Sequence, residues 1–121
     1  MRTLTIDIGG TGIKLLPIND TDQAFTRRHR ELTPRPSTPD AVMAVIREMV
    51  GVQDPFDRVS VGFPGVVRHG VIDTAPNLGT PQWKGFNLQK AVTDVCGKPA
   101  RVLNDAELQG FGVISGTGVE I

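Results

Sequence analysis

One stretch constrains the fold of this chain more than any other: residues 5–14, TIDIGGTGIK, in which an extended segment ends at an acidic residue and enters a glycine turn. Apolar and polar residues alternate through residues 3–8, and an extended pattern resumes at residues 13–18. The pair predicts a β-hairpin. Because glycine allows positive φ angles and close backbone approach, the turn can present several N–H groups to an anion.

The side chains around this turn suit a polyphosphate with its metal ion. Candidate phosphate ligands are the backbone N–H groups of Gly9 and Gly10, the Thr11 hydroxyl and the Lys14 ammonium. Asp7 would repel a bare phosphate, but its carboxylate would hold a Mg²⁺ ion directly or through water. The alternative is an ordinary β-hairpin with Gly-Gly at its turn.

Helical patterns appear in the middle and towards the end of the chain. Thr38 and Pro39 suit the start of a helix that ends at Gly51. Its apolar stripe falls at helical spacing and comprises Val42, Val45, Ile46, Met49 and Val50. A second helix is predicted between a cap at Asn87 and a stop at Gly97. A third is predicted from residue 106 to about residue 114.

Strand patterns lie between these helices. Strands are predicted at residues 59–63 and, as a short buried strand, at residues 100–103. Residues 23–31 are polar and are predicted as a third, edge strand. Residues 66–86 form a long loop with one short hairpin that turns at an exposed His69. Residues 119–121 resemble the opening of a further strand.

The order β-β-β-α-β-α-β-α indicates an α/β fold with a mixed sheet and helices packed on it. Right-handed crossovers would set the strands at residues 2–8, 57–63 and 100–103 parallel and near one another. Ligands of open α/β sheets bind beyond the carboxyl ends of the strands. One crevice would then collect the stretches 7–11, 62–65 and 104–105.

Candidate reactive groups follow these strand ends. Asp105 would act as a general base, taking a proton from a substrate hydroxyl as that oxygen attacks phosphorus; a helix N-cap is its alternative role. Candidate sugar ligands are Gly65, Asn77, Gly79 and Asn104. For residues 77–79 an ordinary turn is the alternative. Trp83 either stacks on a sugar or anchors the loop to the core, and anchoring is favoured.

Composition excludes several classes of protein. Lys+Arg and Asp+Glu both count 13, so no net charge favours nucleic acid or an anionic membrane as a partner. The basic run at residues 27–30 is interpreted as a solvated strand face or loop. Cys96 is the only cysteine, which excludes an intrachain disulfide and fits a reducing cytoplasm. We expect neither a secretory signal nor a membrane span, because no long apolar run occurs.

Several motifs together resemble the ROK family of sugar kinases and sugar-sensing repressors, within the actin/Hsp70/hexokinase superfamily. Residues 6–14 look like the first phosphate-binding motif of that superfamily. Residues 62–65, 76–79 and 83–85 are similar to the sugar-side loops of the family, and residues 102–106 look like its catalytic segment. The resemblance extends over nearly the whole chain, and the subgroup it most resembles is the polyphosphate- or ATP-dependent glucokinases.

This resemblance implies a ribonuclease H-like lobe of the actin type. It also implies that the 6-hydroxyl of glucose attacks the terminal phosphoryl group of ATP or polyphosphate. Asp105 would be the base, and Asn104 with Asn77 would orient the sugar. The turn and Lys14 would hold phosphate, and Asp7 would organise Mg²⁺.

Family members continue for about another domain, so residues 1–121 are expected to be an N-terminal lobe that lacks its C-terminal lobe and is inactive alone. An apolar face exposed in this way would allow a homodimer. The alternatives are a sugar sensor of the repressor branch and an actin-like structural protein. Because the phosphate motif begins almost at Met1, we do not expect the DNA-binding domain of a repressor ahead of it. A filament needs neither the sugar-side loop nor the pair at residues 104–105.

Overall fold

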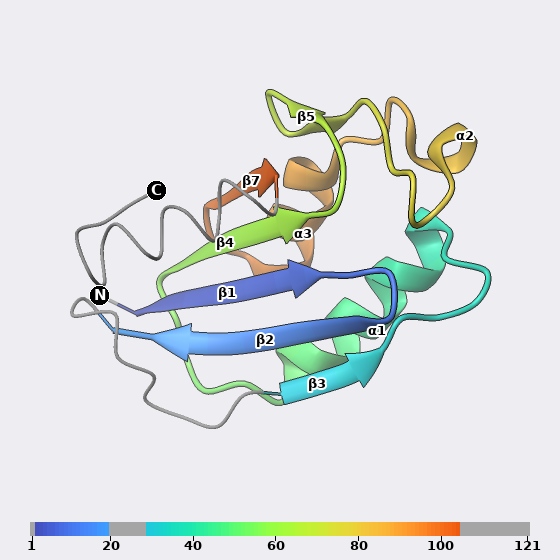
Figure 1. The fold of residues 1–121 in the computed structure, drawn as a ribbon. Helices are drawn as coiled ribbons and strands as arrows, with labels where there is room; N and C mark the ends of the chain where they lie inside the picture. The colour runs from blue at the N-terminus through green and yellow to red at the C-terminus, as the bar shows by residue number, and fades with distance from the viewer. Residues whose placement is uncertain (1, 20–28, 105–121) are drawn as a thin grey trace, which may run out of the picture.

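The computed structural model describes residues 2–19 and 29–104, and within them a five-stranded sheet has the order β3-β2-β1-β4-β7 (Figure 1). The strands are β1 (Thr3–Ile8), β2 (Gly12–Ile18), β3 (His29–Leu32), β4 (Arg58–Phe63) and β7 (Ala100–Asn104). The pair β1 and β2 is antiparallel, as are β2 and β3. In contrast, β1, β4 and β7 run parallel. The predicted hairpin, the mixed sheet and the parallel trio are therefore confirmed.

Two helices pack on one face of this sheet, behind it in Figure 1: α1 (Pro39–Gly51) and α3 (Leu88–Cys96). Both begin at the predicted caps, since Thr38 Oγ1 accepts from the Ala41 N–H at 3.2 Å and Asn87 Oδ1 accepts from the Lys90 N–H at 3.0 Å. A side-chain acceptor satisfies one of the free N–H groups at each helix start. Gly97 follows α3 with φ 66°, the left-handed conformation typical of a glycine stop.

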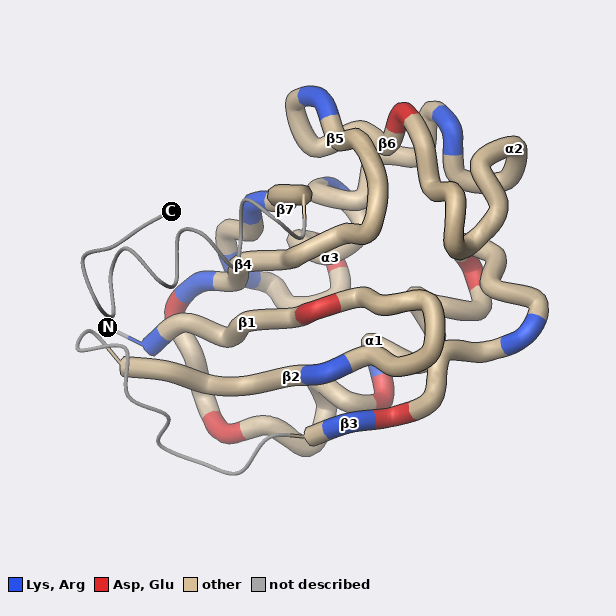
Figure 2. The backbone as a smooth tube through the Cα atoms, in the orientation of Figure 1, with Lys and Arg blue, Asp and Glu red and all other residues tan. Residues whose placement is uncertain are grey.

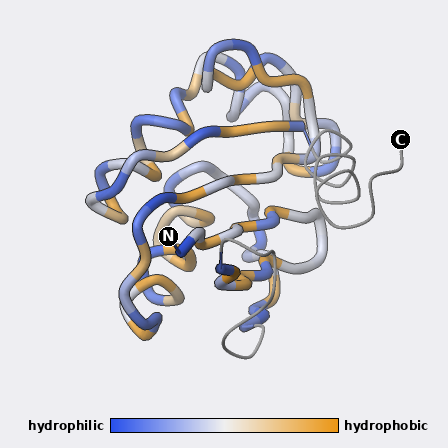
Figure 3. Tube along the Cα trace, turned by 90° about the vertical axis from the view of Figure 1, so that its left-hand side faces the viewer, coloured by the Kyte–Doolittle hydropathy of each residue, from blue (hydrophilic) through white to orange (hydrophobic). Residues whose placement is uncertain are grey.

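The hydrophobic core lies between the sheet and these helices. Alternate strand residues point into it, so hydrophobic and hydrophilic positions alternate along the strands (Figure 3). Fully buried members include Leu4, Ile6, Ile8, Ile13, Leu15, Val42, Ile46, Val61, Phe63, Leu88 and Val92. The opposite face of β1 and β2 carries polar side chains, among them Thr5, Asp7 and Lys14. The core thus fixes which side chains of the hairpin remain available to a ligand.

The long connection after β4 contains more structure than its sequence suggested. The hairpin of β5 (Val67–Arg68) and β6 (Val71–Ile72) turns at His69, which is exposed, and at Gly70, with φ 54° and 81°. This confirms the predicted short hairpin. A four-residue helix, α2 (Thr80–Trp83), was not predicted, because so short an element shows no helical periodicity.

The predicted third, edge strand is confirmed as β3 at His29–Leu32, which overlaps the predicted residues 23–31; residues 20–28 lie outside the described residues. The strand predicted at residues 100–103 is confirmed as β7, but it is less buried than expected. In the described sheet β7 is an edge strand, in which Arg101 is exposed and Val102 is buried. The helix predicted from residue 106 and the strand at residues 119–121 also lie outside the described residues. Across residues 2–19 and 29–104, no helix combines the length and apolar character that crossing a membrane requires.

Candidate functional site

Three strand ends meet at one rim of the sheet. In register, Asp7 on β1 lies opposite Gly62 on β4, and Phe63 on β4 lies opposite Asn104 on β7. Because these strands are parallel, the segments that leave them begin side by side, at the right-hand ends of β1 and β4 in Figure 1. The turn after β1, the loop after β4 and Asn104 therefore share one rim, as predicted. Asp105, the candidate base, lies outside the described residues.

The glycine turn between β1 and β2 is shaped by close contacts rather than by unusual φ angles. The Gly9 N–H donates to the Gly12 carbonyl at 2.9 Å, which closes the turn. Positive φ was expected to be available to these glycines, but none of Gly9, Gly10 and Gly12 adopts it. A Cβ on Gly9 would instead lie 2.9 Å from the Gly12 carbonyl oxygen, and one on Gly10 would lie 3.2 Å from Asn77 Cβ. Glycine is needed here because neighbouring atoms occupy the space of a side chain.

The carbonyl groups of this turn are held by the segment that follows β3. Thr33 Oγ1 donates to the Gly9 carbonyl at 2.6 Å, and Arg35 Nη2 donates to the Gly10 carbonyl at 2.6 Å. The Thr33 N–H donates to the Thr11 carbonyl at 3.2 Å. Within the described residues no hydrogen bond engages the N–H of Gly10 or of Thr11. The protein therefore satisfies the acceptors of the turn and leaves two donors for an anion.

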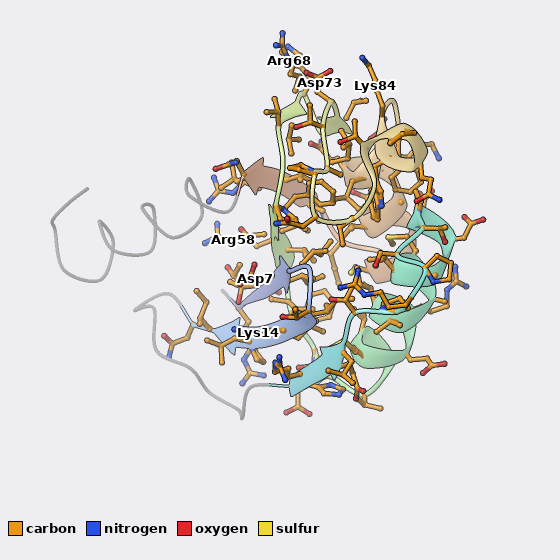
Figure 4. The ribbon with its side chains drawn as sticks, turned by 45° about the vertical axis from the view of Figure 1, so that its right-hand side comes forward. Asp7, Lys14, Arg58, Arg68, Asp73 and Lys84 are labelled. Carbon is orange, nitrogen blue, oxygen red and sulfur yellow. The ribbon has the colours of Figure 1, made fainter. Side chains whose placement is uncertain are left out.

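Asp7 and Lys14 form a cross-strand pair beside this turn. They are register partners on β1 and β2, and Figure 4 shows both on the sheet face away from the helices. In Figure 2 the acidic stretch of β1 adjoins a basic stretch of β2. Both side chains are partly buried, and neither makes an ion pair or hydrogen bond within the part of the chain that the structure describes. A cation and a carboxylate are thus available together at the rim.

Asp7 fits a Mg²⁺ ion that is shared with phosphate. Across residues 2–19 and 29–104, no cluster of three or more His, Cys, Asp or Glu side chains is suited to hold a metal ion. Mg²⁺ does not need one, since it commonly binds through one or two carboxylates, substrate phosphates and water. The single carboxylate of Asp7 has no protein partner in this region to compete with the ion.

The candidate sugar ligands fall into two groups. Asn104 Nδ2 donates to the Gly65 carbonyl at 3.2 Å, which joins the end of β7 to the loop after β4. A Cβ on Gly65 would overlap the Thr74 carbonyl group, so this position needs glycine. Asn77 is exposed and packs against Gly10, while Gly79 precedes α2 with φ 109°. The structure therefore joins Gly65 to Asn104 and brings Asn77 to the glycine turn.

Trp83 anchors the loop, as favoured from the sequence. Its side chain is fully buried, and its ring centroid lies 5.0 Å from that of Phe63 and 5.6 Å from that of Phe86. The indole Nε1–H donates to the Ser37 carbonyl at 2.7 Å. Burial removes this ring from contact with a sugar.

Sequence reasoning missed the segment that supports both loops. Thr33, Arg35 and Ser37 lie among prolines and were interpreted as part of a connecting loop. Serine hydroxyls often bond to nearby backbone, and the Ser37 hydroxyl donates to the Pro34 carbonyl at 2.7 Å. The Thr33 hydroxyl instead reaches Gly9, 24 residues away, which no local pattern predicts. No pattern in the sequence predicts that Arg35 contacts the glycine turn.

Cys96 is not a reactive group of this site. It lies at the end of α3, and burial raises the pKa of its thiol from 9.0 to about 11. The thiolate is the nucleophilic form of cysteine, so this side chain is unreactive near neutral pH.

Several known proteins that are similar to this chain are sugar kinases. The model of the ROK family matches residues 3–114. The chain is 39% identical to a polyphosphate glucokinase of Mycobacterium tuberculosis over 108 aligned residues. This alignment covers 88% of this chain and 40% of that protein. The chain thus spans about two fifths of this relative's length.

Two of the crystal structures that share the fold are sugar kinases. An inorganic polyphosphate/ATP-glucomannokinase from Arthrobacter sp. strain KM has a TM-score of 0.87 and 32% identity, over 98% of this chain and 51% of that one. A ROK family glucokinase from Streptomyces griseus, in complex with glucose and AMPPNP, has a TM-score of 0.85 and 25% identity, over 98% of this chain and 38% of that one. Because the family match extends over nearly all of its 121 residues, the chain belongs to the ROK family.

Proposed function

We propose that this chain is the sugar-recognising lobe of a kinase that transfers a phosphoryl group from ATP or polyphosphate to the 6-hydroxyl of glucose. The observation that carries the proposal is the glycine turn, whose carbonyl groups are bound by Thr33 and Arg35 while the N–H groups of Gly10 and Thr11 have no partner within the described residues. The turn shares a rim with the Gly65–Asn104 pair. The names of the relatives in M. tuberculosis and Arthrobacter support both the sugar and the donor.

The donor would bind at the turn. The N–H groups of Gly10 and Thr11 and the Lys14 ammonium would neutralise phosphate oxygens, and they are oriented before the donor arrives. The Gly9 N–H, predicted as a further phosphate ligand, instead donates to the Gly12 carbonyl. Asp7 would hold Mg²⁺ next to the phosphate chain. When bound, this ion supplies neutralisation of the charge that develops on the transferred phosphoryl group.

The acceptor would bind between the loop after β4 and the end of β7. Asn104 and Asn77 provide amide groups, and Gly65 and Gly79 provide backbone, for the hydroxyl groups of the sugar. Asp105 follows Asn104 directly, so its carboxylate is the candidate base for the proton of the attacking hydroxyl. The rest of the donor site would lie on a C-terminal lobe.

Closure of two lobes excludes water from such a reaction, and we therefore expect the lobe alone to be inactive. A kinase that uses ATP or polyphosphate and has one unreactive cysteine suits the cytoplasm.

The test is a glucose-dependent kinase assay of the protein that contains both lobes, with ATP and with polyphosphate as donor. Asp105→Asn should lower kcat by about 10²–10⁴-fold, the usual contribution of a general base. The matched control is Asp94→Asn, since Asp94 is exposed on α3 and pairs with Lys90. Turnover that survives Asp105→Asn would remove Asp105 from the base role. Glucose binding without turnover in the parent protein would favour a sugar sensor instead.

A further inference from the structure

A second cation lies beside Lys14, on the neighbouring strand. Arg30 on β3 is the register partner of Lys14 on β2, which is in turn the partner of Asp7 on β1. Directly opposed residues in a sheet place their side chains on the same face. The basic stretches of β2 and β3 accordingly run next to each other in Figure 2. Asp7, Lys14 and Arg30 thus form one row across three strands, on the face away from α1 and α3.

The Arg30 side chain leans towards the glycine turn. A Cβ on Gly12 would lie 2.9 Å from both Nε and Nη2 of Arg30, so the guanidinium group occupies the space that a side chain there would fill. Gly12 begins β2 directly after the turn. The planar guanidinium group therefore lies over the end of the hairpin, next to the residues whose N–H groups make no hydrogen bond within the described residues.

No side chain of residues 2–19 and 29–104 neutralises the charge of Arg30. Arg30 is exposed, and it makes no ion pair or hydrogen bond within residues 2–19 and 29–104. Its neighbour Glu31 points to the opposite face of β3 by strand alternation, where it pairs with His29 at 3.0 Å. The row therefore carries two cations and one carboxylate, a set that favours a polyanion over a neutral ligand.

We propose that Arg30 is a binding residue for the phosphate chain of the donor, acting beside Lys14. The inference rests on the proposed function and adds to it a contact that the sequence did not suggest, since residues 27–30 were interpreted as a solvated face or loop. A guanidinium group binds two phosphate oxygens at once, whereas an ammonium group acts as a point charge. Arg30 would hold a phosphate that adjoins the one bound by Lys14.

The experiment titrates the 121-residue chain, labelled with ¹⁵N, with sodium tripolyphosphate and follows the amide signals of Gly10 and Thr11 by NMR. We expect Arg30→Ala to raise the Kd about fivefold, as befits an exposed charge-assisted contact. The Kd of the Arg30→Lys variant should fall between the Kd of Arg30→Ala and that of the parent. The matched control is Arg47→Ala, which removes an exposed charge from α1 and should leave the Kd within about twofold. At higher salt concentration, the Kd values of Arg30→Ala and the parent should differ less.

The outcomes separate this inference from the proposed function. If Gly10 and Thr11 respond in the parent and the Kd is unchanged in both Arg30 variants, the role of Arg30 is wrong and the donor site stands. If tripolyphosphate shifts the amide signal of neither Gly10 nor Thr11 in the parent, the proposed donor site is wrong and Arg30 has no role in it. Arg30→Lys keeps the test decisive if Arg30→Ala alters the fold, because it preserves the charge and the length of the side chain.

Discussion

The two loops at this rim are held in different ways. The glycine turn between β1 and β2 has its carbonyl groups bound by Thr33 and Arg35, which belong to another segment. The loop from β4 to α3 buries Trp83, Ile72 and Ala75 almost fully, and the hydroxyls of Thr74 and Thr80 accept hydrogen bonds from its own backbone. The comparison indicates that side chains of a distant segment shape the donor site, whereas the sugar side is shaped mainly by packing within its own loop.

The largest effect should come from the packing of the loop. Trp83→Ala removes the largest buried side chain, and we expect it to lower the free energy of unfolding by about 4 kcal/mol. Trp83→Phe keeps most of the packing but loses the hydrogen bond to Ser37, and should cost about 1–2 kcal/mol. Urea denaturation followed by circular dichroism measures both, since Trp83 is the only tryptophan and fluorescence is lost with it. A loss below about 1 kcal/mol for Trp83→Ala would contradict the packing account.

A smaller effect is expected at Gly65. Its Cβ would overlap the backbone carbonyl of Thr74, which lacks the freedom of a side chain to move away. Gly65→Ala should therefore cost about 2–3 kcal/mol of unfolding free energy. It should also abolish the response of the Asn104 side-chain amide to glucose in NMR, because Asn104 donates to the Gly65 carbonyl.

Gly51→Ala is the control for this substitution, since no atom lies within 4 Å of a Cβ there. It should change stability by no more than about 0.5 kcal/mol. If Gly65→Ala and Gly51→Ala are equally stable, the loop tolerates a side chain at Gly65. The close contact with the Thr74 carbonyl would then not determine the path of the loop.

At the glycine turn a hydrogen bond should matter more than volume. Thr33→Val keeps the shape of the side chain but leaves the Gly9 carbonyl without its donor at 2.6 Å. Thr33 is only 6% exposed, so water replaces that donor poorly, and we expect a cost of about 1–2 kcal/mol. Tripolyphosphate binding, followed at the Gly10 amide, should weaken as well.

Thr93→Val is the matched control, because the Thr93 hydroxyl donates to the Gln89 carbonyl at 2.8 Å on the exposed side of α3. It should leave tripolyphosphate binding unchanged. Unchanged binding in Thr33→Val as well would mean that the hydrogen bond to Gly9 does not shape the turn.

How far the sequence predicts this structure depends on how local each determinant is. The β1–β2 hairpin and the caps at Thr38 and Asn87 depend on neighbouring residues, and all were predicted. The parallel strands followed from the handedness of crossovers. The rim was therefore predictable in outline, from strand ends alone.

The support of the rim was not predictable, because its contacts join distant residues. Thr33 and Arg35 reach the turn across 24 and 25 residues, and Trp83 reaches Ser37 across 46. The glycines of the turn show a related limit. Their identity suggested positive φ angles, but the structure uses them for close contact, and a sequence does not distinguish these two reasons for glycine.

The smallest expected effect tests whether the two loops are independent. Ser37 connects them, because its carbonyl accepts from Trp83 and its hydroxyl accepts from Arg35 Nη1 at 3.1 Å. A double-mutant cycle of Trp83→Phe and Arg35→Gln should give a coupling of about 0.5 kcal/mol in unfolding free energy, as is typical of residues that share a partner. The same cycle with Arg47→Gln in place of Arg35→Gln should be additive. If the changes in unfolding free energy are additive in both cycles, the packed loop and the hydrogen-bonded turn are stabilised independently. Coupling only in the cycle with Arg35→Gln would mean that destabilising the sugar-side loop also destabilises the donor-side turn.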